Sequence, residues 1–597
     1  MLEKQRDLSE ITLDDGVPCA QLSPDIHFAE LADAVQGDSP AAQQEKITWE
    51  LASILFDKVD HHGGALSEED ERKANLVDFW ERITSNAAAK QAESTSSAEE
   101  KAIAQLSTHD VWGASGTLTT GRDFRLATMI AQLDGDNAMK EGMVEQIKKW
   151  READVVPEMT LAIRTLYELL AGNTCLSNGK GGSVGLENRA ETFNISSKFG
   201  LDWKRAFGLK LWYGISSNEP LDAAVQAFSV DLENGDEKVQ PTPWFVEQKV
   251  ETGWTDAKRG QCQDVLWGLL RLYISRTASS SFNLGEILTP ENVAGNPVDA
   301  RLSFQLFQLL HAHTLAGATS SSDEDEDTAT HTSDILSSTL ISQLSPLPTH
   351  LPSAILASLY LSSPAARAST IRALLNRHAS ALSASAGNPT AISATLINDL
   401  KIPEAWLWSA RALYAAAVQG DHAEEIRCLL RASEFEDAHE RLRTTVAPRM
   451  LIEEDIDDLD ALLLECKDAG LADVSGWESG GRLYTDYVRL VELRQQGVRI
   501  GREGAEGEAE VEEMEDVVMR LMQATEAARE KNRKMGLEER VAVSEMRELV
   551  EKVRRESGEE VGEEGLGAEK ASEELRRAEE ASKRFYERFA GSVAVGA

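Results

Sequence analysis

One segment, Gly200–Ile215, constrains the fold of this chain more than any other. On a helix that begins at Trp203, apolar side chains occur on almost every side, and the polar interruptions are Lys204, Arg205 and Lys210. A surface helix normally carries one apolar stripe, whereas a helix that is apolar nearly all round is buried on both faces or covered by a partner. The segment therefore predicts a layered helical protein and points toward an interaction scaffold.

The composition narrows the class of protein. The chain has 597 residues, of which 42% are hydrophobic, and a formal net charge of −40. This length predicts an elongated or multi-domain protein. The negative charge, without any basic segment rich in aromatic residues, argues against nucleic-acid binding, because phosphates are bound by concentrated Lys and Arg. No apolar run reaches the length of a membrane span, and the N-terminus lacks a signal-peptide core. We expect a soluble protein on the cytosolic or nuclear side.

No chemical motif favours an enzyme. The five cysteines are far apart and form no CxxC pair, which predicts reduced, structural thiols. Lys180 lies in a glycine-rich stretch but has the wrong spacing for a phosphate-binding loop, and the motifs of serine hydrolases and zinc proteases are absent. A helical hydrolase or transferase would need a catalytic cluster that the sequence does not offer. We predict no catalytic residue, no metal and no cofactor.

Helical periodicity dominates the chain before its last 120 residues. The segment Glu99–Leu133 is predicted to be a helix that reaches Val111, a short turn at Gly121 and Arg122, and a second helix. No fixed repeat length is present, which favours an irregular helical stack over a tandem-repeat array. The other predicted helices are Phe28–Val35, Met139–Ala153, Met159–Ala171, Leu221–Glu233, Val265–Arg276, Ala300–Ala316, Ile355–Leu361, Ala366–Leu382, Ala405–Gln419 and Glu424–Ser433.

Several segments lack this periodicity. Ser320–Ser333 is acidic and free of large apolar residues, so we expect a disordered insertion between helices. Asn173–Gly185 is predicted to be a loop, and Gln240–Trp254 to be irregular. Before Trp49, only Ile11–Asp15 resembles a strand, so at most one strand is expected there.

The chain from about Gly501 is rich in Glu, Arg and Lys but keeps narrow apolar stripes. Val517 and Leu521 lie on one such stripe, and Phe585 and Phe589 on another. Charged helices of this kind usually dock onto a neighbour or pair with one another. A solvated, partly disordered acidic tail is the alternative.

Ungapped blocks of the sequence resemble a known family. Taken in order over Trp49–Leu464, they resemble a fungal scaffold nucleoporin, the C-terminal product of the autocleaved FG-nucleoporin precursor, which is a helical subunit of the Y-shaped nuclear pore complex. Because the chain carries neither an autoproteolytic domain nor FG repeats, we expect a mature product or a shortened form. The blocks are Trp49–Asp57, the pair His109–Ala114 and Gly121–Leu133, Arg189–Ile215, Pro243–Gln248, Val265–Tyr273, Asn296–Leu310 and Arg431–Asp457.

The resemblance implies the all-α fold of the ancestral coatomer element, an irregular α-solenoid folded back on itself, with trunk, crown and tail. It implies a chain that leaves through the trunk, passes the crown and returns along the trunk. The expected parts are an N-terminal extension (1–44), outgoing trunk helices (45–170), the crown (171–300), returning trunk helices (301–456) with a disordered acidic loop (320–333), and a tail of charged helices (457–597).

The resemblance also implies partners. In this family the crown packs against the crown of a second helical nucleoporin in the stalk, and the tail meets the two arm subunits. A WD-repeat propeller shared with the COPII coat is completed by a strand insertion. Because at most one strand is expected before Trp49, either that insertion lies upstream or the propeller contact uses other residues. The implied role is that of a nuclear pore scaffold at the nuclear envelope, which supports transport of protein and mRNA. A helical subunit of a vesicle or other membrane coat is the alternative, since such coats share this fold.

Large apolar side chains are the candidate partner contacts, because a few buried aromatic anchors carry most of the affinity of an interface. For each crown candidate, packing within the chain's own core is the alternative, since a two-layer stack also needs large side chains. The candidates in the crown are Trp203, Phe207, Leu211, Trp212, Trp267 and Tyr273, and those in the tail are Val517, Leu521, Phe585 and Phe589.

Overall fold

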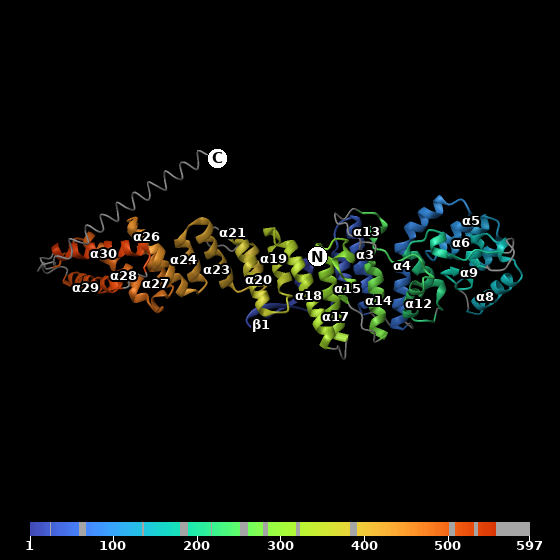
Figure 1. Cartoon of the computed structure of the whole chain (residues 1–597), viewed down its shortest axis with the longest axis horizontal. Helices are drawn as coiled ribbons and strands as arrows, with labels where there is room; N and C mark the ends of the chain where they lie inside the picture. The colour runs from blue at the N-terminus through green and yellow to red at the C-terminus, as the bar shows by residue number, and fades with distance from the viewer. Residues whose placement is uncertain are drawn as a thin grey trace, which may run out of the picture. The chain divides into compact units, whose positions relative to one another are not determined.

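The computed structural model describes residues 1–23, 26–58, 67–133, 137–179, 189–216, 218–250, 261–278, 284–317, 323–382, 391–500, 508–530 and 535–556. Within them the chain is almost entirely helical, with two short antiparallel strand pairs, which confirms the predicted all-α fold (Figure 1). The chain forms two compact units, Met1–Arg367 and Ala368–Ala597. The predicted boundaries at residues 44, 170, 300 and 456 fall inside these units, and the five-part division stays a prediction.

The elements of the first unit are α1 (Leu2–Asp7), β1 (Ser9–Asp14), β2 (Val17–Leu22), α2 (Phe28–Ala34), α3 (Pro40–Phe56), α4 (Glu68–Ser94), α5 (Ala98–Leu106), α6 (Val111–Thr120), α7 (Phe124–Ile130), α8 (Asn137–Glu152), η1 (Val156–Glu158), α9 (Leu161–Leu170), β3 (Leu176–Ser177), β4 (Phe193–Asn194), α10 (Ile195–Lys198), α11 (Trp203–Leu209), η3 (Lys210–Gly214), α12 (Leu221–Asn234), α13 (Trp244–Glu247), α14 (Val265–Ala278), α15 (Leu284–Ile287), α16 (Pro290–Val293), α17 (Arg301–Gly317), α18 (Asp323–Leu344), η5 (Pro348–His350), α19 (Leu351–Ser358) and the start of α20 (Pro364–Arg377).

The second unit continues from α20 with α21 (Ala379–Leu382), α22 (Ala391–Ala394), η6 (Thr395–Asp399), α23 (Glu404–Tyr414), η7 (Ala415–Gln419), α24 (His422–Arg431), α25 (Phe435–Arg441), η8 (Leu442–Val446), α26 (Ala447–Ile452), α27 (Ile456–Asp468), η9 (Leu471–Asp473), η10 (Trp477–Ser479), α28 (Gly481–Gln495), α29 (Glu508–Glu530) and α30 (Leu537–Glu556). Four of the short elements, η3, η6, η7 and η8, are π-helical turns that continue an α-helix.

The first unit folds back on itself. The chain leaves along α3 and α4, turns through α5 to α9, which pack on one another beyond α4, and returns along α11, α12, α14 and α17 (Figure 1). Returning helices lie against outgoing ones: α11 packs on α4, and α14 packs on α3. An ion pair of 2.6 Å joins Arg301 of α17 to Glu45 of α3. The predicted fold-back is therefore present within this unit.

Several corners between helices are made by a residue other than glycine in the left-handed conformation. At Arg122 φ is +70°, and the amide of the next residue, Asp123, donates to the carbonyl of Leu118 at 3.0 Å. This six-to-one bond is the signature of a helix that ends in a Schellman motif. His109, with φ +64°, ends α5 in the same way, so the helix predicted to reach Val111 is two helices. Asp154, Ser433 and Glu454 make equivalent corners.

Replacing Arg122 with glycine should stabilise the first unit. A left-handed conformation costs an L-residue about 1–2 kcal/mol, and glycine avoids this cost while losing more backbone entropy on folding. We expect Arg122→Gly to raise the free energy of unfolding by about 0.5–1 kcal/mol. Thermal unfolding measures the change. The matched control is Arg125→Gly in α7, which should lower stability by about 1 kcal/mol; equal losses in both variants would contradict the prediction.

Four expectations about irregular segments are wrong in whole or in part. Gln240–Trp254 contains the helix α13, and Asn173–Gly185 contains the strand β3. The N-terminal region holds two strands, not one at most: β1 and β2 form a hairpin that Asp15 and Gly16 close with φ of +50° and +77°. An Asp-Gly pair is a preferred sequence for a two-residue type I′ turn, so the pair itself indicates a hairpin between two strands. The acidic stretch Ser320–Ser333 is helical from Asp323 onward, as the start of α18. Acidic residues suit this position because the helix dipole is positive at the N-terminus.

The described part of the acidic tail is folded. α29 packs on α28, and α30 packs on α26 and α29. Met514, Val517 and Leu521 of α29 join one core with Met546 and Val553 of α30. The prediction that charged helices with narrow apolar stripes dock onto a neighbour is confirmed for residues 508–530 and 537–556. Phe585 and Phe589 lie outside the described residues.

Candidate partner-binding surfaces

The helix that opens the sequence argument is present and buried. α11 begins at Trp203, where the side chain of Asp202 accepts from the amide of Arg205 at 2.9 Å, and it runs into the π-helical turn η3. A π turn holds an extra residue and re-aims the side chains that follow it. Here Leu211 and Tyr213 point into the core, whereas Trp212 is partly exposed.

Four of the six candidate crown residues lie in the core of the chain itself. Trp203 and Phe207 are fully buried, and Leu211 and Trp267 are at most 3% exposed. The ring centroid of Phe207 lies 6.0 Å from that of Trp267 and 4.9 Å from that of Trp80 on α4. The alternative of intramolecular packing therefore describes these four side chains. A partner would reach them only if the fold opened.

The remaining two crown candidates are half-buried. The Trp212 ring stacks on His109 with centroids 5.3 Å apart and an interplanar angle of 11°. The Tyr273 ring meets Phe56 edge-on at 6.3 Å, and the Arg72 guanidinium lies over it at 5.9 Å. Both side chains bridge helices of the first unit, and their partial exposure leaves only an edge for a partner.

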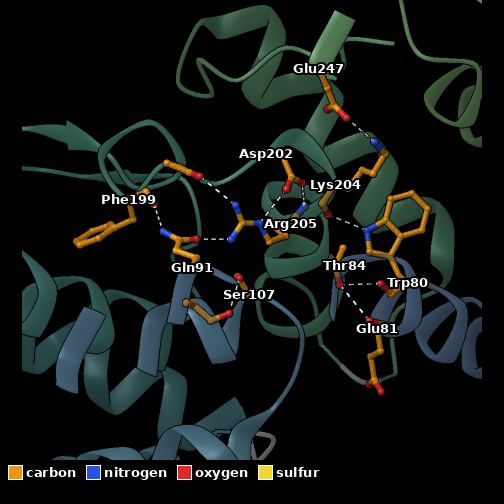
Figure 2. A network of polar contacts seen from close by, with 12 residues as sticks. Trp80, Glu81, Thr84, Gln91, Ser107, Phe199, Asp202, Lys204, Arg205 and Glu247 are labelled. Atoms are coloured by element: carbon orange, nitrogen blue, oxygen red, sulfur yellow. Dashed lines mark hydrogen bonds and ion pairs between the residues drawn. The ribbon is translucent and has the colours of Figure 1, made fainter. Parts of the chain in front are cut away.

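Polar contacts fasten α11 to α4, a long helix that was not predicted. Figure 2 shows the Arg205 guanidinium between the carboxylate of Asp202, at 2.9 Å, and the side-chain carbonyl of Gln91. Gln91 in turn donates to the carbonyl of Phe199 at 2.6 Å, and the indole of Trp80 donates to the carbonyl of Lys204 at 2.7 Å. Arg205, counted as a polar interruption of the sequence, is only 5% exposed. The Arg205 guanidinium is therefore paired with groups of the chain itself.

A second group of charges joins α11 to α13 and α14, and only its Asp264 is fully buried. The ammonium of Lys204 pairs with Glu247 at 2.7 Å. Asp264 is buried and accepts from the amide of Leu266 at 2.8 Å, which caps α14. Burial raises the pKa of Asp264 to about 6, although the nearby Lys204 charge opposes the rise. Burial likewise raises the pKa of Glu247. The Lys204–Glu247 pair lies at the surface and the Asp264 carboxylate beneath it, and together they join α11 to the helices on either side.

The described ranges offer no cluster of metal-ligating side chains, and two of their buried thiols are weakly acidic. They contain no group of three or more His, Cys, Asp or Glu side chains placed to hold a metal ion. Burial raises the pKa of the Cys428 thiol to about 11 and that of Cys466 to about 12, so neither is a ready nucleophile. Of the helices whose residues are described, none is both long and apolar enough to cross a bilayer.

Among the residues that the structure describes, the most exposed aromatic side chains lie on two helices that were not candidates. Trp112 on α6 is 82% exposed, and Phe124 on α7 is 63% exposed. The two helices pack together, and the Ser115 hydroxyl of α6 donates to the carbonyl of Ala127 on α7 at 3.0 Å. We name the exposed residues Trp112, Gly116 and Thr120 of α6 and Phe124 and Thr128 of α7 the α6–α7 face.

The sequence contained a signal for this face. α6, VWGASGTLTT, has no charged residue, although 27% of the chain is charged. Phe124 follows the apolar periodicity of its helix together with Leu126 and Ile130, but apolar periodicity does not distinguish a core stripe from a partner stripe. An uncharged helix with an exposed tryptophan is the kind of apolar surface that marks an interaction site in a water-soluble fold.

The two described candidates of the second unit lie in its core. Val517 and Leu521 are 1% and 0% exposed and belong to the core between α28, α29 and α30. Exposed apolar side chains nearby are Met519 on α29, Leu464 on α27 and Leu537 on α30, each more than half exposed. A helix that turns one stripe inward carries its accessible apolar residues on the opposite side.

Comparison with known proteins decides the family. A family model described as nuclear protein 96, Nup96, matches residues 100–414, just over half of the chain. The chain belongs to the Nup96 family. The matched residues run from α5 to the end of α23 and include the α6–α7 face, α11 and its neighbours.

Relatives of this Nup96-family chain agree with the resemblance seen in the sequence. Nucleoporin NUP145 of Chaetomium thermophilum is 31% identical over 80% of this chain and 22% of its own length. Nucleoporin nup189 of Schizosaccharomyces pombe is 28% identical over 82% of this chain and 26% of its own. Nuclear pore complex protein Nup98-Nup96 of Drosophila melanogaster is 25% identical over 66% and 19%.

The chain spans about a fifth to a quarter of the length of these relatives. The resemblance to a fungal scaffold nucleoporin is thereby confirmed. So is the prediction that a Nup96-family chain is not an enzyme, since its relatives are named as components of the pore.

Proposed function

We propose that this chain is a structural scaffold subunit of the nuclear pore complex at the nuclear envelope. In this role it holds partner nucleoporins at fixed positions and so supports nucleocytoplasmic transport of protein and mRNA. The observation that carries the proposal is the Nup96 match over α5 to α23, together with relatives named as nucleoporins. A vesicle coat is not favoured, because none of the relatives reported above is named as a coat protein.

The packing of the first unit explains how such a scaffold keeps its geometry. Aromatic rings from α4, α11 and α14 interlock at centroid distances of 4.9–6.4 Å. The Arg205 contacts and the Glu45–Arg301 ion pair then fix α11 on α4 and α17 on α3. A dense core of this kind resists compression and transmits force between its surfaces. Partners bound at separate places are thereby held at set distances.

The α6–α7 face is the proposed contact for the helical partner of the stalk in the Y-shaped assembly. Exposed Trp112 and Phe124 supply two aromatic anchors, and small residues such as Gly116 allow a partner helix to approach closely. This replaces the buried residues of α11 as the contact, while keeping the expectation of a helical partner. The face belongs to residues 111–128, before the predicted crown.

The arm subunits and the WD-repeat propeller are two further partners that the family resemblance implies. We propose that the arm subunits contact the second unit through its exposed apolar residues, among them Met519 and Leu464. Binding of the WD-repeat propeller is not assigned to the hairpin. The Ala20 amide of β2 already donates to the Leu359 carbonyl at 3.1 Å, and the Ser9 hydroxyl lies 2.7 Å from that of Tyr360. These bonds tie the hairpin to the end of α19.

Location in the cell tests the proposed function. A fluorescently tagged chain is expected to mark a continuous ring at the nuclear envelope and to copurify with other nucleoporins identified by mass spectrometry. The control is the same tag alone. Punctate cytoplasmic fluorescence, with vesicle-coat subunits as the copurified proteins, would assign the chain to the alternative class.

A further inference from the structure

A groove runs along one side of α4, apart from the α6–α7 face. Its volume is about 560 Å³, within the roughly 300–1,000 Å³ of ordinary ligand-binding clefts. One stripe of α4 lines one side, and the end of α5 with the connection to α6 lines the other. The lining residues are Asp78, Glu81, Arg82, Ser85, Ala88, Ala89 and Ala92 on α4, followed by Gln105, Thr108 and Asp110.

The α4 side of the groove has the length and the shape to receive a helix. Its residues recur every three or four positions from Asp78 to Ala92, a rise of about 21 Å along the helix axis. Toward Ala92 this side is made only of small side chains. Small residues let the backbone of a second helix come close, and large side chains of that helix then fill the space above them. In helix-in-groove recognition, the bound helix places its apolar anchors at positions i, i+3, i+4 and i+7 along such a groove.

Charge distinguishes the two ends of the groove. Glu81 pairs with His109 at 2.6 Å, and Asp110 accepts from the amide of Gly113 at 2.8 Å, so both lie near the junction of α5 with α6. Asp78 is exposed one turn before Glu81. The guanidinium of Arg82 is engaged with Glu50 at 2.7 Å. One end therefore carries three carboxylates against a single paired arginine, and the other end carries alanines.

We propose that the α4 groove binds an amphipathic helix of a partner protein. Its occupant presents about three apolar side chains to Ser85, Ala89 and Ala92, and Lys or Arg to Asp78 and Asp110 at the acidic end. Opposite charges across such a contact guide the encounter and set the direction of the bound helix. The basic end is the C-terminal one, because cations are favoured where the helix dipole is negative. This contact is separate from the proposed stalk contact and does not depend on it.

A model helix tests the proposal with the whole chain. The probe is a fluorescein-labelled peptide of about 18 residues, with leucine at every third or fourth position and lysines in its last turn. Fluorescence anisotropy measures its Kd. Ala89→Trp fills the groove and should weaken binding at least tenfold. The matched control is Ala87→Trp on the same helix; Ala87 is also an exposed alanine but does not line the groove, so Kd should stay within twofold.

Charge is tested in the same assay. Asp78→Lys should raise Kd about threefold or more, whereas Glu93→Lys, an exposed acid on α4 outside the groove, should leave it within twofold. Ser85→Trp serves as a second groove variant if Ala89→Trp lowers the melting temperature. Equal affinities for the groove and control variants, or no binding at about 1 mM peptide, would overturn the proposal.

Discussion

Replacing Phe207 with alanine is expected to destabilise the first unit by about 3–5 kcal/mol, the usual cost of truncating a buried phenylalanine. The side chain is fully buried, and its ring lies 4.9 Å from Trp80, 5.6 Å from Phe228 and 6.0 Å from Trp267 by centroid. Truncation opens a cavity among three large rings that sit on separate helices and cannot close around it. Urea unfolding of the full chain, followed by tryptophan fluorescence, measures the loss.

The control for Phe207→Ala is Phe124→Ala. Phe124 is 63% exposed, so its truncation should change the free energy of unfolding by no more than about 0.5 kcal/mol. The comparison also separates the two interpretations of the opening helix. A Phe207→Ala chain that unfolds like the wild type but no longer binds its helical partner would mean that Phe207 is a contact and not a core residue.

Charging the α6–α7 face should remove the stalk partner and leave the fold intact. In the double variant Trp112→Glu, Phe124→Glu, two aromatic anchors are lost and two carboxylates enter an uncharged surface. Residues of this kind cost about 2 kcal/mol or more each at the centre of an interface, so binding should weaken about a thousandfold. Isothermal titration against the helical stalk nucleoporin measures Kd, and circular dichroism checks the melting temperature.

Val298→Glu is the matched control for that experiment. Val298 is 58% exposed and belongs to the same unit, but it lies outside the α6–α7 face. This variant should bind the partner with wild-type affinity. If the double variant also kept wild-type affinity, the stalk contact would lie elsewhere on the chain.

The sequence predicted the class of fold well because helical periodicity is a local property. α2, α8, α9, α12 and α14 lie within a few residues of their expected ranges. Some errors fall at corners, where rare backbone conformations decide, and others fall on charged segments such as α4 and the start of α18, whose weak apolar periodicity hides a helix. The helix expected to reach Val111 ends at Leu106, because the His109 backbone takes a left-handed conformation. A histidine does not by itself indicate such a conformation in a sequence.

The candidate site was predicted less well for a physical reason. A core face and a partner face have the same apolar periodicity, and only the neighbours in space distinguish them. Trp203 and Trp112 are both aromatic residues near helix starts, yet one is fully buried and the other is 82% exposed. The burial of Trp203 depends on Trp80, which lies more than a hundred residues earlier on a helix that the sequence did not reveal.

The fold-back of the first unit means that outgoing helices are synthesised well before the returning helices that cover them. The Trp80 indole and the Lys204 carbonyl that it binds are 124 residues apart, and Glu45 and Arg301 are 256 apart. At about 5–20 residues per second, a ribosome needs about 6–25 s to supply the first partner and about 13–50 s to supply the second. During that interval the aromatic side of α4 has no returning helix to cover it. The apolar side of α4 is therefore exposed on the nascent chain for many seconds. We expect chaperones to bind α4 until α11 has been synthesised.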